Sequence, residues 1–338
     1  MLENIFLLLG AVALFLYSLK LLGEGVSEIA GEKMKSFVRA STSNRCGACL
    51  AGLISTAVAQ SSVATNMIVI AFVKKGIINF IAASAVIMGT NIGTTVTAQL
   101  VSLSSVSQFN VIAIGSFIAF LGFVFSLSKS ELLKRVAKAL IGFGFLFMGI
   151  ELLTQVVEKF KGYAWFTALF LVKNPLLLLL NGFIITAVLQ SSSVVTSVMI
   201  VLAELSLLNF SNASFIILGA NIGTCLPVIF ASLSMGKESV KCSIFNITFN
   251  IIGSLIFILP LILLGNEIQS IKIFSSSVGR SIANFHTFFN FTVCIILLPF
   301  LKPVCKLVER FTEFLYNDKN AERTQKIFFN GKISLKRR

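Results

Sequence analysis

Two polar runs interrupt the most apolar parts of this sequence, and their side chains could bind an anion. The seven residues are Gln60, Ser61, Ser62, Gln190, Ser191, Ser192 and Ser193. Serine hydroxyls and carboxamide N–H groups donate hydrogen bonds without carrying a charge. Such donors suit a tetrahedral oxyanion that must be released again, whereas a buried arginine would hold it more firmly. We therefore take these residues as candidate oxyanion ligands.

A second pair of motifs offers neutral oxygen atoms, which suit a small hard cation such as Na+. The sequence reads GTNIGT at 89–94 and GANIGT at 219–224. The matching side chains are Asn91, Thr94, Asn221 and Thr224. We expect each motif to interrupt its helix and to free backbone carbonyl groups. Neither motif contains Asp, Glu or His, so a proton-coupled carrier would need a titratable group elsewhere. The residue types therefore favour sodium as the coupling ion.

A third pair of motifs, FNITFN at 245–250 and FHTFFN at 285–290, carries two more candidates, Asn250 and Asn290. Each lies four residues after another polar residue, Asn246 or His286, and so shares a helix face with it. These faces could line the same cavity, or they could form hydrogen bonds between helices. Both interpretations remain open at this stage.

The sequence contains an internal duplication. Residues 52–105 align with 182–235 at a constant offset and without a gap, and 22 of the 54 pairs are identical. A serine in a membrane helix often bonds the carbonyl of its own helix four residues earlier. Packing alone does not explain why Q-S-S recurs at one offset and is followed by N-I-G-T both times. The paired motifs therefore predict a shared binding site.

The composition predicts an all-helical polytopic membrane protein. Of the 338 residues, 56% are hydrophobic and 12% are charged, whereas about 25% are charged in soluble domains. A helix needs about 20 apolar residues to cross the hydrocarbon core. Stretches long enough to cross are 4–25, 77–103, 109–127, 132–157, 209–233, 242–264 and 281–301. Two further stretches, 48–73 and 175–203, contain the polar runs, and we interpret them as re-entrant helical hairpins.

The duplication and the hairpins together predict inverted repeats. Repeat 1 covers about 4–127 and repeat 2 about 132–264, and each has an entry helix, a hairpin, an N-I-G-T helix and a further helix. Three of those four elements cross the membrane, so the second repeat has the opposite orientation in the membrane. The two hairpins then enter from opposite sides, and their tips meet near the midplane. Each tip then presents the N-terminus of a half-helix, a site that favours anions.

The net charge of +14 is concentrated on one predicted side of the membrane. Lys and Arg crowd the loops on that side and the tail after 302, as expected of a cytoplasmic surface. This sorting assigns the basic residues to membrane topology and anionic lipid rather than to nucleic acid. This assignment of the loops requires that 48–73 and 175–203 re-enter the membrane. If these stretches crossed it instead, the loops that follow them would lie on the opposite side. We expect a transport domain at 1–302, with a final helix at 281–301, and a basic cytoplasmic tail at 303–338.

These motifs resemble those of the sodium-dependent phosphate cotransporters of the type II class and their bacterial relatives. The resemblance rests on the duplicated Q-S-S, the paired N-I-G-T and HTFFN at 286–290, and it covers nearly all of 1–302. It implies that the two Q-S-S runs bind phosphate and Na+. Val63 departs from the family's Q-S-S-S pattern in the first repeat, where it removes one expected hydroxyl.

We therefore expect a multi-pass protein of a bacterial inner membrane, with its C terminus in the cytoplasm, that couples phosphate uptake to Na+ by alternating access. Phosphate export and transport of sulfate or arsenate are alternatives within transport. A channel or a phosphate sensor is the alternative from another class. The sequence offers no nucleophile paired with a base, no metal cluster and no P-loop, so we expect no enzyme activity. We expect no cofactor, with Na+ as the coupling ion.

Overall fold

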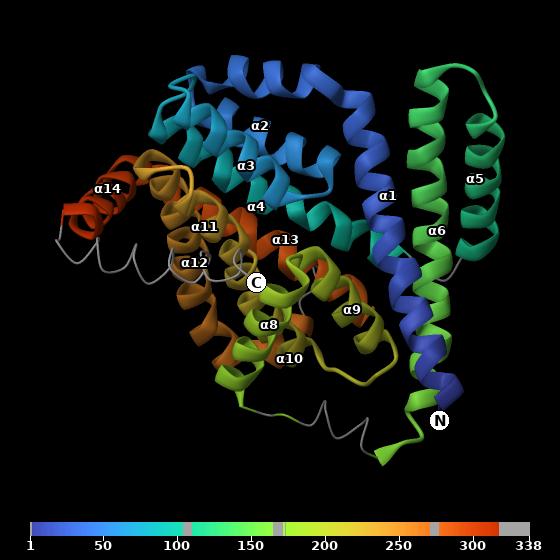
Figure 1. Cartoon of the computed structure of the whole chain (residues 1–338). Helices are drawn as coiled ribbons and strands as arrows, with labels where there is room; N and C mark the ends of the chain where they lie inside the picture. Colours follow the sequence, from blue (N-terminus) through green and yellow to red (C-terminus); the bar gives the residue numbers. More distant parts are fainter. Residues whose placement is uncertain (1, 104–109, 165–171, 173, 271–276, 318–338) are drawn as a thin grey trace, which may run out of the picture.

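The computed structural model describes residues 2–103, 110–164, 172, 174–270 and 277–317, and the regular elements in these ranges are helices. The helices, shown in Figure 1, are α1 Leu2–Ala40, η1 Ser41–Ser43, α2 Arg45–Ala59, α3 Ser62–Lys74, α4 Phe80–Ser102, α5 Val111–Ser126, α6 Glu131–Phe160, α8 Pro175–Leu189, α9 Ser192–Glu204, α10 Phe210–Gly223, α11 Cys225–Leu233, α12 Lys237–Ser270, α13 Val278–Leu297 and α14 Leu301–Asn317. The chain is an all-α polytopic membrane protein.

Five helical segments of the described ranges are long and apolar enough to span a membrane. They are α1, α4, α6, the α10–α11 pair and α12. A sixth candidate is the pair of α13 and α14 taken as one span, although the two helices are bent by 87° at the break between them. The remaining expected crossing, 109–127, forms α5, which has 16 residues. That length is short of the roughly 20 residues of a straight crossing.

The two broken stretches form matching helical pairs, and each first arm packs closely on one core helix. In repeat 1, α2 packs on α4, and in repeat 2, α8 packs on α10. A Cβ added at Gly89 would lie 1.8 Å from the carbonyl oxygen of Cys49, and one added at Gly219 would lie 1.8 Å from that of Leu179. Only glycine permits so close an approach of two backbones. The first arm of each hairpin is therefore held against its core helix, α4 or α10, by the same close packing at a glycine.

The core consists of four helices, α4, α10, α12 and α13. Helix α13 lies along α4, and α12 lies along α10. The second hairpin arms complete the arrangement, because α3 contacts α12 and α9 contacts α13. Helices α12 and α13, which carry the FNITFN and FHTFFN motifs, therefore occupy equivalent places in the two halves. Helices α1, α5 and α6 form a separate layer at one side of this core (Figure 1).

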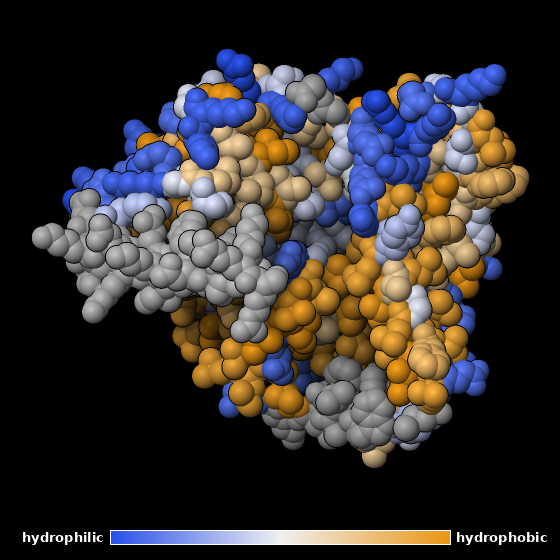
Figure 2. Space-filling model, viewed as in Figure 1, coloured by the Kyte–Doolittle hydropathy of each residue, from blue (hydrophilic) through white to orange (hydrophobic). Residues whose placement is uncertain are grey.

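The surface matches a membrane setting. Figure 2 shows hydrophilic residues gathered at one end of the molecule and an apolar flank beneath them. Large apolar side chains that are exposed include Phe117 and Phe120 of α5, Leu176 of α8, and Leu259 and Leu263 of α12. Exposed apolar side chains in such number suit contact with lipid.

Helix α14 extends ordered structure beyond residue 302, where the sequence analysis expected a tail to begin. One face, with Leu301, Cys305 and Val308 buried, packs on α12 and α4. Another face exposes Phe311 and Phe314. A helix with a second apolar face next to charged residues is typical of the membrane interface. The rest of the expected tail, 318–338, lies outside the described residues.

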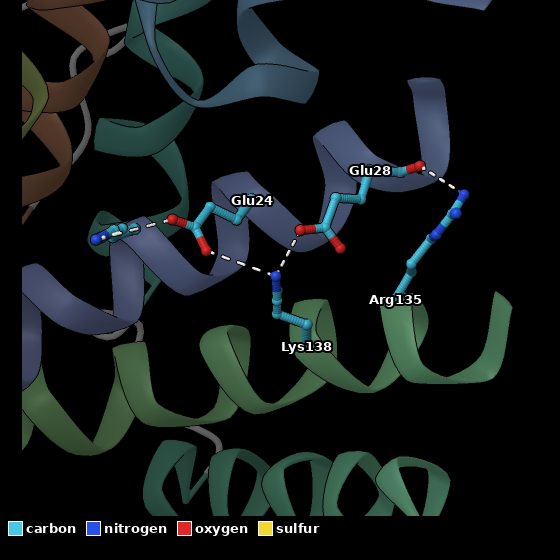
Figure 3. Close-up of polar contacts among 5 residues, drawn as sticks. Glu24, Glu28, Arg135 and Lys138 are labelled. Atoms are coloured by element: carbon cyan, nitrogen blue, oxygen red, sulfur yellow. Dashed lines mark hydrogen bonds and ion pairs between the residues drawn. The ribbon is translucent and has the colours of Figure 1, made fainter. Parts of the chain in front are cut away.

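Ion pairs hold α1 to α6 at the hydrophilic end. The Nζ atom of Lys138 lies 3.6 Å from Oε2 of Glu24 and 2.5 Å from Oε1 of Glu28 (Figure 3). All three side chains are at least 32% exposed, so each pair contributes below about 1 kcal/mol to stability.

We expect Lys138→Met to lower the melting temperature slightly in low salt. The difference from wild type should vanish in about 1 M KCl, where the Debye length is about 3 Å. Thermal melts of the purified protein at both salt concentrations provide the measurement. A decrease of the same size at both concentrations would instead show that the ion pairs to Glu24 and Glu28 are not the source of the effect.

Candidate functional site at the hairpin tips

Both hairpins turn at a glutamine in the left-handed backbone region. Gln60 has φ 52° and ψ 21°, and Gln190 has φ 57° and ψ 21°. This conformation costs a residue with a Cβ atom about 1–2 kcal/mol and normally selects glycine. Two glutamines in one strained conformation indicate that the side chain is required at the tip.

Serines cap the half-helices that begin at the two turns. The Ser61 hydroxyl accepts from the Ala64 N–H at 3.2 Å, and the Ser191 hydroxyl accepts from the Val194 N–H at 3.4 Å. Within the described residues, the hydroxyls of Ser62 and Ser192 make no hydrogen bond. Each half-helix therefore presents a free hydroxyl and first-turn N–H groups at its positive end.

The two tips meet at one turn of α4. The Thr97 hydroxyl donates to Oε1 of Gln60 at 2.6 Å. From the second hairpin, the Ser193 hydroxyl donates to the backbone carbonyl of Thr94 at 3.4 Å. Thr94 and Thr97 are three residues apart, which is about 4.5 Å along a helix. The structure thus brings the two Q-S-S runs together from opposite halves of the chain.

The two tip glutamines differ in how they are held. The Gln60 carboxamide is used at both ends, because its Nε2 also donates to the Ala57 carbonyl at 2.6 Å. Gln190 is exposed, and its carboxamide makes no hydrogen bond in the described part of the chain. Pro227 stands where the duplication has Thr97 in repeat 1, so the second half lacks the hydroxyl that holds Gln60. The glutamine of the first tip is therefore anchored, whereas the glutamine of the second tip is free.

The expected interruption at both N-I-G-T motifs was wrong for the first repeat. Helix α4 runs without a break from Phe80 to Ser102. The second motif does end a helix, at Gly223 of α10. Pro227 explains this difference, because it has no N–H to offer the Gly223 carbonyl. The hydroxyls of Thr94 and Thr224 each bond a carbonyl of their own helix four residues earlier, at 2.8 and 3.0 Å.

The asparagines of these motifs contact the two core helices. Asn91 donates to Oδ1 of Asn246 at 3.1 Å and accepts from Nδ2 of Asn250 at 3.1 Å. In the second half, Asn221 contacts His286 at 3.2 Å. Oδ1 of Asn250 and Oδ1 of Asn290 are buried and have no partner. Helices α12 and α13 therefore each carry one buried amide oxygen that could still accept a hydrogen bond or bind a cation.

Sequence reasoning missed one matched pair, Thr56 and Thr186. Their hydroxyls are buried and have no hydrogen-bond partner. Both pack on the glycine of an N-I-G-T motif, since a Cβ on Gly93 would lie 2.8 Å from Cβ of Thr56, and one on Gly223 would lie 3.0 Å from Cβ of Thr186. Their equivalence in the duplication was the signal that could have identified them.

A pocket of about 260 Å³ lies beside the first tip, between α1, α2 and α3. It is lined by Ser27, Met34, Ser55, Ala59 and Thr65, among others. Ala59 immediately precedes Gln60. The described residues contain no group of three or more His, Cys, Asp or Glu side chains that could hold a metal ion. The tips thus offer neutral hydrogen-bonding groups and helix N-termini.

Several curated proteins resemble this chain. The uncharacterized protein YqeW of Bacillus subtilis is 27% identical over 88% of this chain and 94% of its own length. The "Putative inorganic phosphate export protein YjbB" of Escherichia coli is 26% identical over 90% of this chain, which spans 55% of YjbB. Human sodium-dependent phosphate transport protein 2B is 34% identical over 30% of this chain and 15% of its own length. No solved structure matches.

The family model for Na+/Pi-cotransporters matches this chain in two stretches, residues 14–155 and 157–289. The first match runs from α1 into α6, and the second runs from the end of α6 into α13. Together they cover most of the chain, so this multi-pass membrane protein belongs to the Na+/Pi-cotransporter family.

Proposed function

We propose that this protein transports inorganic phosphate together with Na+ across a bacterial inner membrane. The observation that supports this proposal best is the meeting of two equivalent Q-S-S tips on one turn of α4. The C-terminal helix α14 would lie on the cytoplasmic side, where the basic residues gather. Family membership supports phosphate as the substrate.

Phosphate would bind between the tips. The free hydroxyls of Ser62 and Ser192, the N–H groups at the start of α3 and α9, and the carboxamide of Gln190 are the available donors. Ser61 and Ser191 would contribute through their hydroxyl hydrogens, since their oxygens cap the half-helices. Gln60 and Ser193 already bond α4 and would fix the tips in place. Half-helix N-termini facing the site stabilise the anion without a fixed positive charge.

Sodium would bind to neutral oxygens near the same turn. The unpartnered Oδ1 atoms of Asn250 and Asn290 and the hydroxyls of Thr56 and Thr186 are buried acceptors that the fold leaves unsatisfied. Such atoms favour a bound cation or water, because a buried acceptor without a partner costs about 1–3 kcal/mol. Asn91, Thr94 and Thr224 would shape these sites from α4 and α10.

Uptake into proteoliposomes tests the proposal. We expect an inward Na+ gradient to drive accumulation of labelled phosphate, whereas an equal K+ gradient should not. The double variant Gln60→Ala, Gln190→Ala should lose this uptake, because both tip carboxamides are removed. Uptake that is indifferent to Na+ would reject the coupling, and absence of phosphate flux under both gradients would reject the transport function.

Phosphate export is the second candidate, because the E. coli relative carries that name. Inverted repeats can work in either direction, and the ion gradients then set the net flux. Efflux from phosphate-loaded vesicles with Na+ inside or outside distinguishes the two directions. Competition by sulfate or arsenate in the same assay tests whether another oxyanion is the preferred substrate.

A further inference from the structure

We propose that His286 is a positioning residue that holds Asn221 so that the Asn221 amide nitrogen donates hydrogen bonds to the bound oxyanion. The proposal rests on the proposed function and states which side of that site supplies hydrogen-bond donors to the anion. The observations concern the contact between α10 and α13 and its counterpart between α4 and α12.

The contact fixes the direction of one hydrogen bond. His286 is fully buried, and its Nε2 atom lies 3.2 Å from Oδ1 of Asn221. An amide oxygen can only accept, so the ring must donate through Nε2–H. The other ring nitrogen, Nδ1, is then an acceptor, and it has no partner.

This bond occupies the oxygen end of Asn221 and leaves the nitrogen end free. Nδ2 of Asn221 is buried and has no partner within the described residues. A buried donor that stays unpaired costs about 1–3 kcal/mol. Such a group in a native structure requires an explanation, and a bound anion is one that fits a donor. Asn221 therefore suits an oxyanion better than a cation.

The counterpart contact, between α4 and α12, shows the opposite arrangement. The Asn91 amide nitrogen donates to Asn246, and its oxygen accepts from Asn250, so both ends are used. Asn246 occupies the position that His286 has in the second motif. Where the partner helix carries Asn246, both ends of the Asn91 amide are hydrogen-bonded. Where it carries His286, the amide nitrogen of Asn221 remains free. The two contacts therefore differ in whether the asparagine keeps an unbonded amide nitrogen.

The free donor belongs to the part of the fold that borders the second tip. Helix α9 begins at Ser192 and packs against both α10 and α13, which carry Asn221 and His286. Gln190 at the same tip is also without a partner. The second half therefore presents free donors in both its hairpin and its core, whereas the amide nitrogen and the amide oxygen of Gln60 and of Asn91 are all hydrogen-bonded.

Two variants separate positioning from packing. His286→Gln keeps a donor close to the position of Nε2, whereas His286→Leu keeps an apolar side chain of similar size and removes the donor. The readout is the dissociation constant for radiolabelled inorganic phosphate, measured on purified protein at saturating Na+. The half-saturating Na+ concentration and the melting temperature are measured beside it.

We expect His286→Leu to weaken phosphate binding about tenfold, the factor for one hydrogen bond to a charged ligand. The Na+ dependence should stay unchanged, and His286→Gln should bind phosphate nearly as wild type does. Equal phosphate affinity in His286→Leu and wild type overturns the proposal. So does an equal loss in both variants, because a purely structural histidine would behave in that way. Wild-type protein that binds phosphate without transporting it would refute only the proposed transport.

Discussion

Alanine at Gly89 or Gly219 is expected to prevent this protein from accumulating in folded form. The added Cβ would lie 1.8 Å from a backbone carbonyl oxygen of the neighbouring hairpin arm. No rotation of a flexible side chain relieves that contact, so the hairpin and its core helix must separate. Overpacking of a core costs about 1–3 kcal/mol or more, and a clash between two backbones belongs at the upper end of that range.

Size-exclusion chromatography of the detergent-extracted protein gives the measurement. We expect each variant to elute as aggregate or to be lost from the membrane fraction. Gly10→Ala is the matched control, because Gly10 is also helical but has nothing within 4 Å of its Cβ position. That variant should remain monodisperse and gain about 1 kcal/mol of helix propensity. A monodisperse Gly219→Ala with the wild-type melting temperature would contradict the packing described for α8 and α10.

The double variant Ser62→Ala, Ser192→Ala is expected to reduce phosphate affinity more than any other change of similar size. Both hydroxyls face no protein partner in the described chain, so their removal breaks no hydrogen bond of the fold. A hydrogen bond to a charged ligand contributes about 1.5–3 kcal/mol. Two lost donors should therefore raise the KM for phosphate by at least about a hundredfold.

Initial rates of phosphate uptake at saturating Na+ provide that KM. Ser239→Ala is the control, since the Ser239 hydroxyl likewise has no hydrogen-bond partner but lies in the first turn of α12. It should leave the KM unchanged. If the double variant keeps the wild-type KM while Gln190→Ala does not, phosphate is bound by the carboxamide and the N–H groups rather than by these hydroxyls.

The sequence was sufficient to predict the hairpins and their tips, because the features that define them recur at a constant offset. The turns at Gln60 and Gln190, the serine caps and the Asn79 and Asn209 caps before α4 and α10 all occur in matching pairs. Asn174 caps α8 ahead of Pro175, as local sequence rules predict. The duplication shows the same local sequence pattern twice, which supports predicting the same local structure at both places.

The features that the sequence did not predict depend on contacts between distant segments or on one exchanged residue. The paired FNITFN and FHTFFN motifs relate α12 to α13, but only the packing of these helices on α10 and α4 shows where they lie in the core. The continuous α4 was missed because N-I-G-T resembles a helix break, whereas Pro227 alone ends the second helix. The charged composition of 303–317 predicts a tail, whereas the residues that α14 buries, Leu301, Cys305, Val308 and Thr312, are spaced along one helix face among the charged ones.

The unequal anchoring of the two tips has a consequence for turnover. Gln60 is already ordered by Thr97, so the first tip loses little conformational entropy when a substrate arrives. Gln190 has no such anchor, so its side chain must be immobilised at each binding event, at roughly 0.5–1.5 kcal/mol. That ordering weakens affinity and is recovered on release. A carrier in which both tip glutamines were anchored would bind its substrate more tightly and release it more slowly. Pro227, which replaces the anchoring threonine in the second half, therefore favours fast substrate release over high affinity.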